Sequence, residues 1–390
     1  MRFPFRITRN RLAVVEAKAY VVNSLTNWGQ HLMGGTAYSE QAAYGTHPWV
    51  YRCVRITEQA LAGIPLKTYR KGDKRPVELL SGPITDSFQY PNESTSQREL
   101  IESMVNALQL CGNALIALVP VGSSTLLLPL NPRRVTLARD GDVLQGYEYH
   151  AASGKATRLR LDEVVHVKYQ SDEDPLWGIG PLQAARKSYQ DDQLMRQHNR
   201  TILQNGGIPP RVVITTEQNL TSDQIKENLM RWRETHAGPQ NAGNPALLTG
   251  GFQLKDFGLS QQDLDFIESQ LKTMREVCTV FGVPSSKMND GISDASNHRS
   301  MERAFLNDTV LPLCATISDQ INNQMWKLER RARFMPSETY VRFDTSQVPE
   351  LVRERQELEE ADRLNVRDGI STINRVLTSR GEDPVAWGDV

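Results

Sequence analysis

Apolar residues recur at helical spacing between residues 258 and 288. Six of them follow one another at intervals of three or four: Leu264, Ile267, Leu271, Met274, Cys278 and Phe281. This spacing places side chains on one face of an α-helix. Gly282 and Pro284 end the repeat, because glycine favours a helix terminus and proline does not continue a helix. The pattern predicts a helix over 260–281, followed by a loop over 285–298.

The same criteria predict further helices and short strands along the chain. Helices are expected over 10–33, 46–63, from Ser96, over 181–205, from Ser222, after 299 with a kink at Pro312, and over 349–365 and 371–379. Strands are expected over 64–69, 114–119, 135–138, 164–169, 212–215, 245–248 and 340–343. Long helices combined with runs of short strands indicate an α+β fold.

The helix expected over 181–205 is unusually polar. Asp192 and Asn199 interrupt its apolar face. A helix this polar is better explained if it bridges domains or packs among copies of the same chain. Residues 207–257, with a strand, a helix and a second strand, lie between this helix and the next, so we expect them to project as a small separate unit.

Composition narrows the class of protein. The chain has 390 residues, enough for two or more cores, with a net charge of −1 and a pI near 6.7. Such a balance argues against tight, charge-driven binding of DNA, but not against a protein past which DNA slides. The four cysteines have no metal-binding spacing and are expected to be reduced, buried and intracellular. No signal peptide and no run long enough to cross a bilayer is evident, so we expect a soluble protein made in the cytoplasm.

Signals for catalysis are weak. The chain lacks a P-loop and an H-E-x-x-H motif, and Ser293 lies in a sequence that only approaches a nucleophile elbow. The acidic residues 172–174 and 191–192 fit Mg²⁺ ligands of a nuclease in type, but a solvated loop and a helix surface are the simpler interpretation. His166 and His198 lack partners at ligand spacing, which favours core or surface roles.

The order of several segments resembles the HK97-type portal proteins of tailed bacteriophages. The resemblance covers roughly 46–390 and rests on VYRCVRITEQALAGIPLKTYR (50–70), LQLCGNALIALVP (108–120), LLPLNPRRVTL (127–137), DEVVHVKY (162–169), WGIGPLQAA (177–185), NGGIPPRVVI (205–214), LLTGGFQLKDFGLSQQDLDFIES (247–269), EVCTVFGVPSSKM (276–288) and STINRVLTSRGEDPVAWGD (371–389). Their order and spacing, rather than any one motif, make the resemblance specific.

The resemblance implies a portal fold with an α/β wing, a two-helix stem, a small α/β clip insertion and a helical C-terminal crown. The expected boundaries are 1–45 for an N-terminal extension, 46–180 for the wing, 181–206 and 258–284 for the stem helices, 207–257 for the clip, 285–298 for a tunnel loop, 299–348 for the long helix and strand of the wing, and 349–390 for the crown. Gly282 and Pro284 become the hinge that ends the second stem helix.

The implied function is a ring, expected to be a dodecamer, at one vertex of a capsid, through which double-stranded DNA is packaged and ejected. The expected DNA-facing residues are Lys287, Asn289, Asp290, Asn297, His298 and Arg299. For Lys287, His298 and Arg299, an ordinary surface position is the alternative interpretation. Expected partners are the terminase large subunit, a head–tail connector or adaptor, and the major capsid or scaffolding protein, with no membrane. The resemblance implies no catalytic residue, metal or cofactor, and a location in the virion after assembly in the bacterial cytoplasm.

Two alternatives stay open at this stage. One is a metal-dependent nucleic-acid enzyme that uses the acidic clusters. The other keeps the portal fold but places it in a gene transfer agent or a defective prophage, which the sequence does not distinguish from an infectious phage.

Overall fold

A computed structural model describes residues 44–72, 76–121, 124–151, 154–204, 212–215, 221–236, 253–256, 262–288, 295–332, 339–380 and 383–389. These residues divide into two compact units. Unit 1 contains 54–179 and 295–389, and unit 2 contains 44–53 and 180–288. Both units combine helices with antiparallel sheets, which confirms the α+β class. The helix expected over 10–33 lies outside the described residues.

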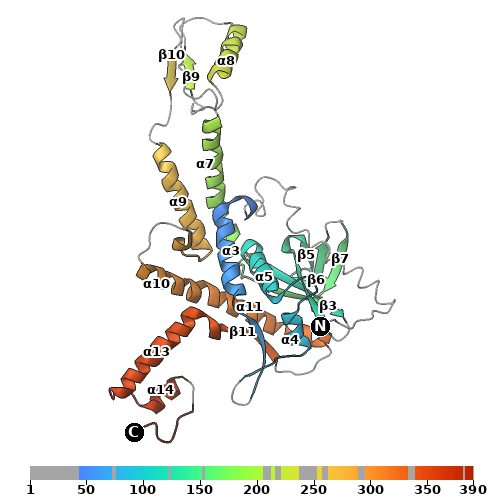
Figure 1. The fold of residues 1–390 in the computed structure, drawn as a ribbon. Coiled ribbons are helices and arrows are strands. Elements are labelled where there is room, and N and C mark those ends of the chain that lie inside the picture. The colour runs from blue at the N-terminus through green and yellow to red at the C-terminus, as the bar shows by residue number, and fades with distance from the viewer. Residues whose placement is uncertain are drawn as a thin grey trace. The chain divides into compact units, whose positions relative to one another are not determined.

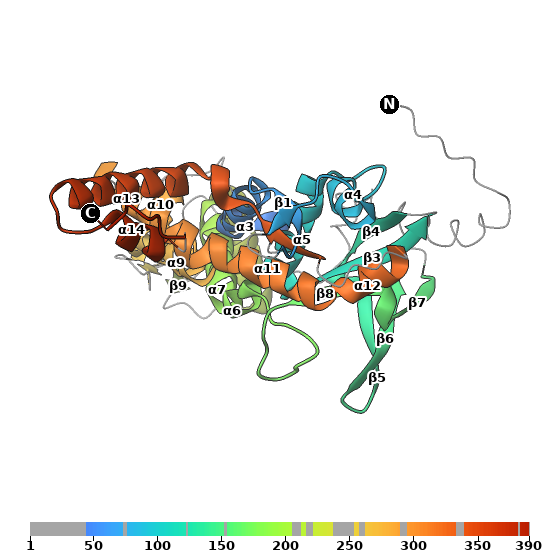
Figure 2. The same cartoon turned by 90° about the horizontal axis from the view of Figure 1, so that it is seen from below.

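Unit 1 contains most of the strands (Figures 1 and 2). Its helices are α3 (Pro48–Ala62, which passes from unit 2 into unit 1 after Cys53), α4 (Pro83–Gln89), α5 (Gln97–Cys111), α10 (Ala295–Phe305), α11 (Leu311–Asn323), α12 (Met325–Ala332), α13 (Pro349–Arg367) and α14 (Ile373–Ser379). Its strands are β1 (Leu66–Arg70), β2 (Val77–Glu78), β3 (Asn113–Val121), β4 (Ser124–Leu130), β5 (Val135–Asp140), β6 (Val143–His150), β7 (Ala156–Arg160), β8 (Val164–Lys168) and β11 (Thr339–Phe343). They pair in the orders β11-β1-β2, β4-β3-β8 and β5-β6-β7.

The core of unit 1 lies between two of these sheets. Strand β3 reads as an almost continuous apolar run, and its first seven residues are all buried, as expected of a strand covered on both faces. Strand β6 contributes Tyr147 and Tyr149 to the same apolar cluster, which also contains Leu115 and Val164. The two sheets therefore share one hydrophobic core.

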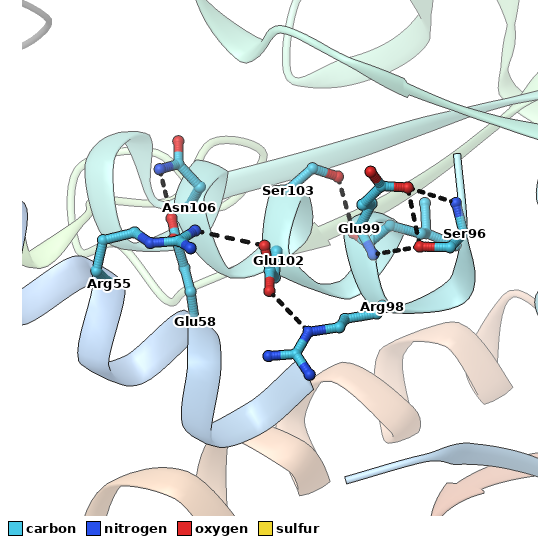
Figure 3. Close-up of polar contacts among 9 residues, drawn as sticks. Arg55, Glu58, Ser96, Arg98, Glu99, Glu102, Ser103 and Asn106 are labelled. Atoms are coloured by element: carbon cyan, nitrogen blue, oxygen red, sulfur yellow. Dashed lines mark hydrogen bonds and ion pairs between the residues drawn. The ribbon is translucent and has the colours of Figure 1, made fainter. Parts of the chain in front are cut away.

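Helices α3 and α5 are joined by a polar network within unit 1 (Figure 3). Glu58 is only 2% exposed and accepts hydrogen bonds from Asn106 Nδ2 at 2.6 Å and Arg55 Nη1 at 2.8 Å. Burial raises the pKa of Glu58, and these two donors partly offset that effect. The helix expected from Ser96 begins with a capping box, in which the Ser96 backbone N–H donates to the Glu99 carboxylate at 2.7 Å.

The long helix expected after residue 299 is divided. A π-helical turn at Leu306–Val310 separates α10 from α11, which begins just before Pro312. Proline lacks an N–H for the carbonyl four residues earlier, and its ring crowds that carbonyl, so a wider preceding turn relieves the conflict. The predicted irregularity at Pro312 thus takes the form of a widened turn.

Unit 2 contains two long helices and a small insertion. Its elements are α6 (Pro181–Ala184), α7 (Arg186–Gln204), β9 (Val212–Thr215), α8 (Ser222–His236), β10 (Gln253–Asp256), α9 (Gln262–Val280) and the 3₁₀ turn η5 (Ser285–Met288). Helices α7 and α9 run side by side, and β9, β10 and α8 lie at one end of the pair (Figure 1).

The elements predicted for unit 2 and those observed differ in one helix and one strand. The helix expected over 181–205 is confirmed over most of its length but is divided, because Ala185, with φ −75° and ψ −3°, separates α6 from α7. The strand expected over 245–248 lies outside the described residues. Strand β10, which pairs antiparallel with β9, was not predicted, because only one of its four residues, Leu254, is apolar.

The cysteines follow the expectation with one exception. Cys53, Cys278 and Cys314 are buried, whereas Cys111 is half-buried at the end of α5, where Arg133 Nε donates to its sulfur at 3.3 Å. Among the described helices, none has both the length and the hydropathy needed to span a membrane.

Candidate functional site

The segment that ends helix α9 has a well-defined geometry within unit 2. The Gly282 N–H donates to the Thr279 carbonyl at 3.1 Å, and the Val283 N–H donates to the Cys278 carbonyl at 2.9 Å. These two bonds form a Schellman motif, which requires a left-handed residue at the position of Gly282. Its φ of +64° meets that requirement. The sequence therefore predicted the helix stop and its residue correctly.

Packing fixes the chain on both sides of this stop. Of the predicted apolar seam of α9, Met274, Cys278 and Phe281 are buried, whereas Leu271 is 36% exposed. Val277 is buried beside them and was missed, because it lies outside the strict three-and-four repeat. The side chains of Leu264 and Ile267 lie outside the described residues.

Beyond the stop, the backbone turns into η5 instead of an open loop. Val283 and Met288 are buried, at 3% and 7% exposure, and the Lys287 N–H donates to the Pro284 carbonyl at 3.0 Å. The expectation of a loop starting at residue 285 is thus wrong for its first four residues, because two apolar side chains anchor them. Lys287, which lies between these anchors in the sequence, is half-buried.

The other expected DNA-facing residues fall in three places. Asn289 and Asp290 lie outside the described residues. Asn297 and His298 belong to α10, which begins at Ala295, so the C-terminal part of the expected loop is helical; only their backbone is described. Arg299 is exposed on α10 in unit 1, whereas Lys287 belongs to unit 2.

Unit 2 also contains a buried charged cluster that the sequence did not reveal. Asp192 on α7 is 0% exposed, and its Oδ2 lies 3.1 Å from His47 Nε2 and also accepts a hydrogen bond from Arg196 Nε. Burial raises the pKa of the Asp192 carboxyl, but the contacts with His47 and Arg196 outweigh it, so the net pKa is lowered. The interpretation of Asp192 as a solvated helix surface is wrong, whereas its neighbour Asp191 is exposed.

Two of the acidic residues considered as magnesium ligands are paired with arginines. Asp174 pairs with Arg139 in unit 1, and Asp192 pairs with Arg196 in unit 2. Within the described part of the chain, no three His, Cys, Asp or Glu side chains gather in a group suited to hold a metal ion. His166 is a buried core residue, as the sequence favoured, hydrogen-bonded through Nε2 to Asn113 at 3.0 Å.

Comparison with known proteins identifies the protein family of this chain. The family model described as "Phage portal protein" matches residues 48–380, so the chain belongs to the phage portal protein family.

Individual proteins are similar to this chain in sequence or fold. The portal protein of enterobacteria phage HK97 is 25% identical over 351 residues, which cover 87% of this chain and 80% of that protein. A protein of Rickettsia bellii, strain RML369-C, is 27% identical over 326 residues, covering 81% and 82% of the two chains. The neck of an empty gene transfer agent particle, computed with C6 symmetry, contains a chain of similar fold, with a TM-score of 0.62 and 24% identity; the match covers 94% of this chain and 100% of that one.

Proposed function

We propose that copies of this chain assemble into a ring that forms a channel for double-stranded DNA at one vertex of a virion. The observation that carries the proposal is the match over 94% of this chain to a subunit of a gene transfer agent neck computed with C12 symmetry, with a TM-score of 0.61 and 24% identity. A subunit repeated about one axis uses two different surfaces for its two neighbours, and such head-to-tail contacts close into a ring.

The same proposal assigns each part of the chain a place in the ring. In this proposal, α7 and α9 form the stem, β9, β10 and α8 form the clip, and α13 and α14 form the crown. The remaining described elements of unit 1 form the wing. The polar sequence of α7 supports this assignment, because a helix with so few apolar residues gains more from packing among neighbouring copies than within one chain.

The segment after α9 is proposed to border the DNA. Lys287 stands at its start and Arg299 follows it, and the residues between them include Asn289, Asp290, Asn297 and His298. A near-neutral chain suits a conduit, because each lysine or arginine held on a phosphate releases counterions and adds affinity that slows moving DNA. A few basic groups are therefore expected at the channel, and not a continuous basic surface.

The proposed partners are the terminase large subunit during packaging, then a head–tail connector, and the major capsid or scaffolding protein during assembly. The ring would do no chemistry itself and would reside in the virion after assembly in the bacterial cytoplasm. The likeness to gene transfer agent necks also keeps a gene transfer particle as a specific second candidate. The origin of the DNA recovered from particles distinguishes it from an infectious phage.

Electron microscopy of the purified full-length chain tests the proposal. We expect rings with a central hole and twelve subunits in class averages of negatively stained particles. A chain that stays a compact monomer across concentrations and salt conditions would overturn the ring. Mg²⁺-dependent cleavage of DNA that disappears in Asp172→Ala would instead favour the enzyme.

A further inference from the structure

The end of the chain is held in one geometry against helix α14. Asn374 is only 9% exposed; its Nδ2 donates to the Val385 carbonyl at 2.9 Å, and its Oδ1 accepts from the Val385 N–H at 2.8 Å. The Asn374 backbone N–H donates to the Gly388 carbonyl at 2.9 Å. A Cβ added at Gly388 would lie 2.3 Å from Asn374 Oδ1, so the fit depends on glycine. One buried asparagine thus fixes residues 385–388.

Trp387 lies within this anchored segment. The side chain is 65% exposed although the residues on either side are anchored. An indole buries roughly 150–250 Å² when it is covered, and a side chain on a fixed backbone loses little freedom on binding. Asp389 is exposed next to it, with Oδ1 3.5 Å from Thr372 Oγ1. We call Trp387 with Asp389 the terminal knob.

A groove suited to such a knob lies elsewhere in unit 1, between strands β1 and β11 and helix α13. Its volume is about 520 Å³, within the range of roughly 300–1,000 Å³ typical of binding pockets. Tyr69 and Tyr340 stack along it, with ring centroids 5.7 Å apart and planes at 25°. Leu358, on α13, lines it while remaining 59% exposed.

Basic side chains accompany the tyrosines. Arg342 from β11 and Arg355 from α13 both line the groove, and both are exposed. Of the acidic lining residues, Asp344 is paired with Lys67 at 2.8 Å, which leaves Glu354 as the other one. An aromatic group flanked by a carboxylate complements this set, because arginine stacks on indole and also pairs with carboxylate.

We propose that the terminal knob of one copy of this chain docks in the Tyr69–Tyr340 groove of the next copy. Tryptophan, tyrosine and arginine are the residues that most often dominate interface energies, and such residues tend to face one another across a contact. Two different surfaces of one chain meet in this contact, so it is head-to-tail and suits a closed ring. The inference rests on the proposed ring and names one contact that joins its subunits.

A pair of tryptophan variants tests the contact in the full-length chain. Trp387→Ala is expected to raise the concentration at which assemblies form by at least about 30-fold, the effect of losing a dominant interface residue. Trp326→Ala is the matched control, because Trp326 is also exposed, at 49%, but lies on α12 outside the groove. Mass photometry over a concentration series measures both, and circular dichroism verifies that each variant is folded.

Cross-linking provides a second measurement that does not depend on the stability of one variant. Leu358→Cys and Trp387→Cys are made in separate chains, mixed and oxidised with copper phenanthroline. A dimer on a non-reducing gel that appears only in the mixture supports the contact, and its absence overturns it. Assembly of Trp387→Ala at the wild-type concentration also overturns the contact and leaves the ring standing. Failure of the wild-type chain to assemble overturns both proposals.

Discussion

The side-chain amide of Gln324 pairs with both backbone polar groups of His166. The His166 N–H donates to Gln324 Oε1 at 3.1 Å, and Gln324 Nε2 donates to the His166 carbonyl at 2.8 Å. His166 lies in β8, the edge strand of the sheet β4-β3-β8, so these groups point away from its neighbour β3. The glutamine amide therefore makes the two hydrogen bonds that a residue of a further neighbouring strand would make.

The same arrangement is repeated along β8. Gln320 bonds both backbone groups of Lys168, at 2.9 and 2.8 Å, and Lys327 Nζ donates to the Val164 carbonyl at 2.8 Å. Alternate strand residues are roughly 6.8 Å apart, and successive helical turns are about 5.4 Å apart. Because these spacings are similar, the segment of α11 and α12, with Gln324 between them, places one polar side chain beside each outward-facing residue of β8. The helices thus cover an edge that would otherwise be open to another strand (Figure 2).

Replacing Gln324 should destabilise unit 1 by leaving two backbone groups without their partner. We expect Gln324→Ala to lower the free energy of unfolding by about 1–3 kcal/mol, the cost of unsatisfied buried polar groups. Asn323→Ala is the control, since Asn323 is the exposed neighbour at the last position of α11. Urea unfolding followed by circular dichroism measures both, and equal midpoints for the two variants would refute the role of the amide.

Acid should destabilise the chain through His166. Burial first, and then the charges of Lys168 and Lys327, lower the pKa of His166 to about 3. The unfolded side chain, with a pKa near ~6.5, therefore binds a proton that the folded one excludes, and stability falls as pH drops below that value. Burial lowers the pKa of Lys327 to about 8, so Lys327 keeps its charge between pH 7 and pH 5.

The measurement compares wild type with His166→Gln at pH 7 and pH 5. The wild type should lose about 2 kcal/mol more unfolding free energy between these pH values than the variant does, since the variant has no proton to take up at this position. Parallel pH dependence in the two proteins would show that His166 is not the group responsible.

Several elements were predictable because their signals are local. The cap at Ser96, the stop at Gly282 and the apolar run of β3 depend on neighbouring residues, and the structure contains all three. The burial of Asp192 was not predictable, because its partner His47 lies 145 positions away. The same holds for Gln324 and His166, which are 158 positions apart. The DNA-facing residues stay a prediction, since a channel depends on neighbouring copies.

The stop at the end of α9 should matter more for DNA passage than for ring formation. Gly282→Ala places a side chain at φ +64°, at a cost of about 1–2 kcal/mol, and Pro284→Ala removes the second barrier to helix extension. The double variant should therefore extend α9 into the segment proposed to border the DNA. Rings should still form, while DNase-protected DNA in a packaging reaction should fall.

Gly141→Ala is the control for the strain alone. Gly141 has φ +60° in the β5–β6 turn, and an added Cβ would meet nothing within 4 Å. This variant should have a similar loss of stability with normal packaging. Normal packaging in the Gly282 and Pro284 double variant would contradict the placement of the tunnel segment after α9.

The buried carboxylate of Asp192 should be a structural requirement of unit 2. Asp192→Ala leaves the buried His47, 5% exposed, without its partner, whereas Arg196, 38% exposed, stays in contact with solvent; an unsatisfied buried polar group typically costs about 1–3 kcal/mol. We expect a loss of about 1–3 kcal/mol in unfolding free energy, whereas Asp191→Ala, at the exposed adjacent position, should change it by less than about 0.5 kcal/mol. Because the pKa of Asp192 is lowered in the folded chain, its contribution is present above the unfolded value near ~3.9 and is lost as pH falls through the folded value. Denaturant unfolding of the two variants at pH 7 measures the difference, and equal stabilities would show that the His47–Asp192–Arg196 cluster contributes little to the fold.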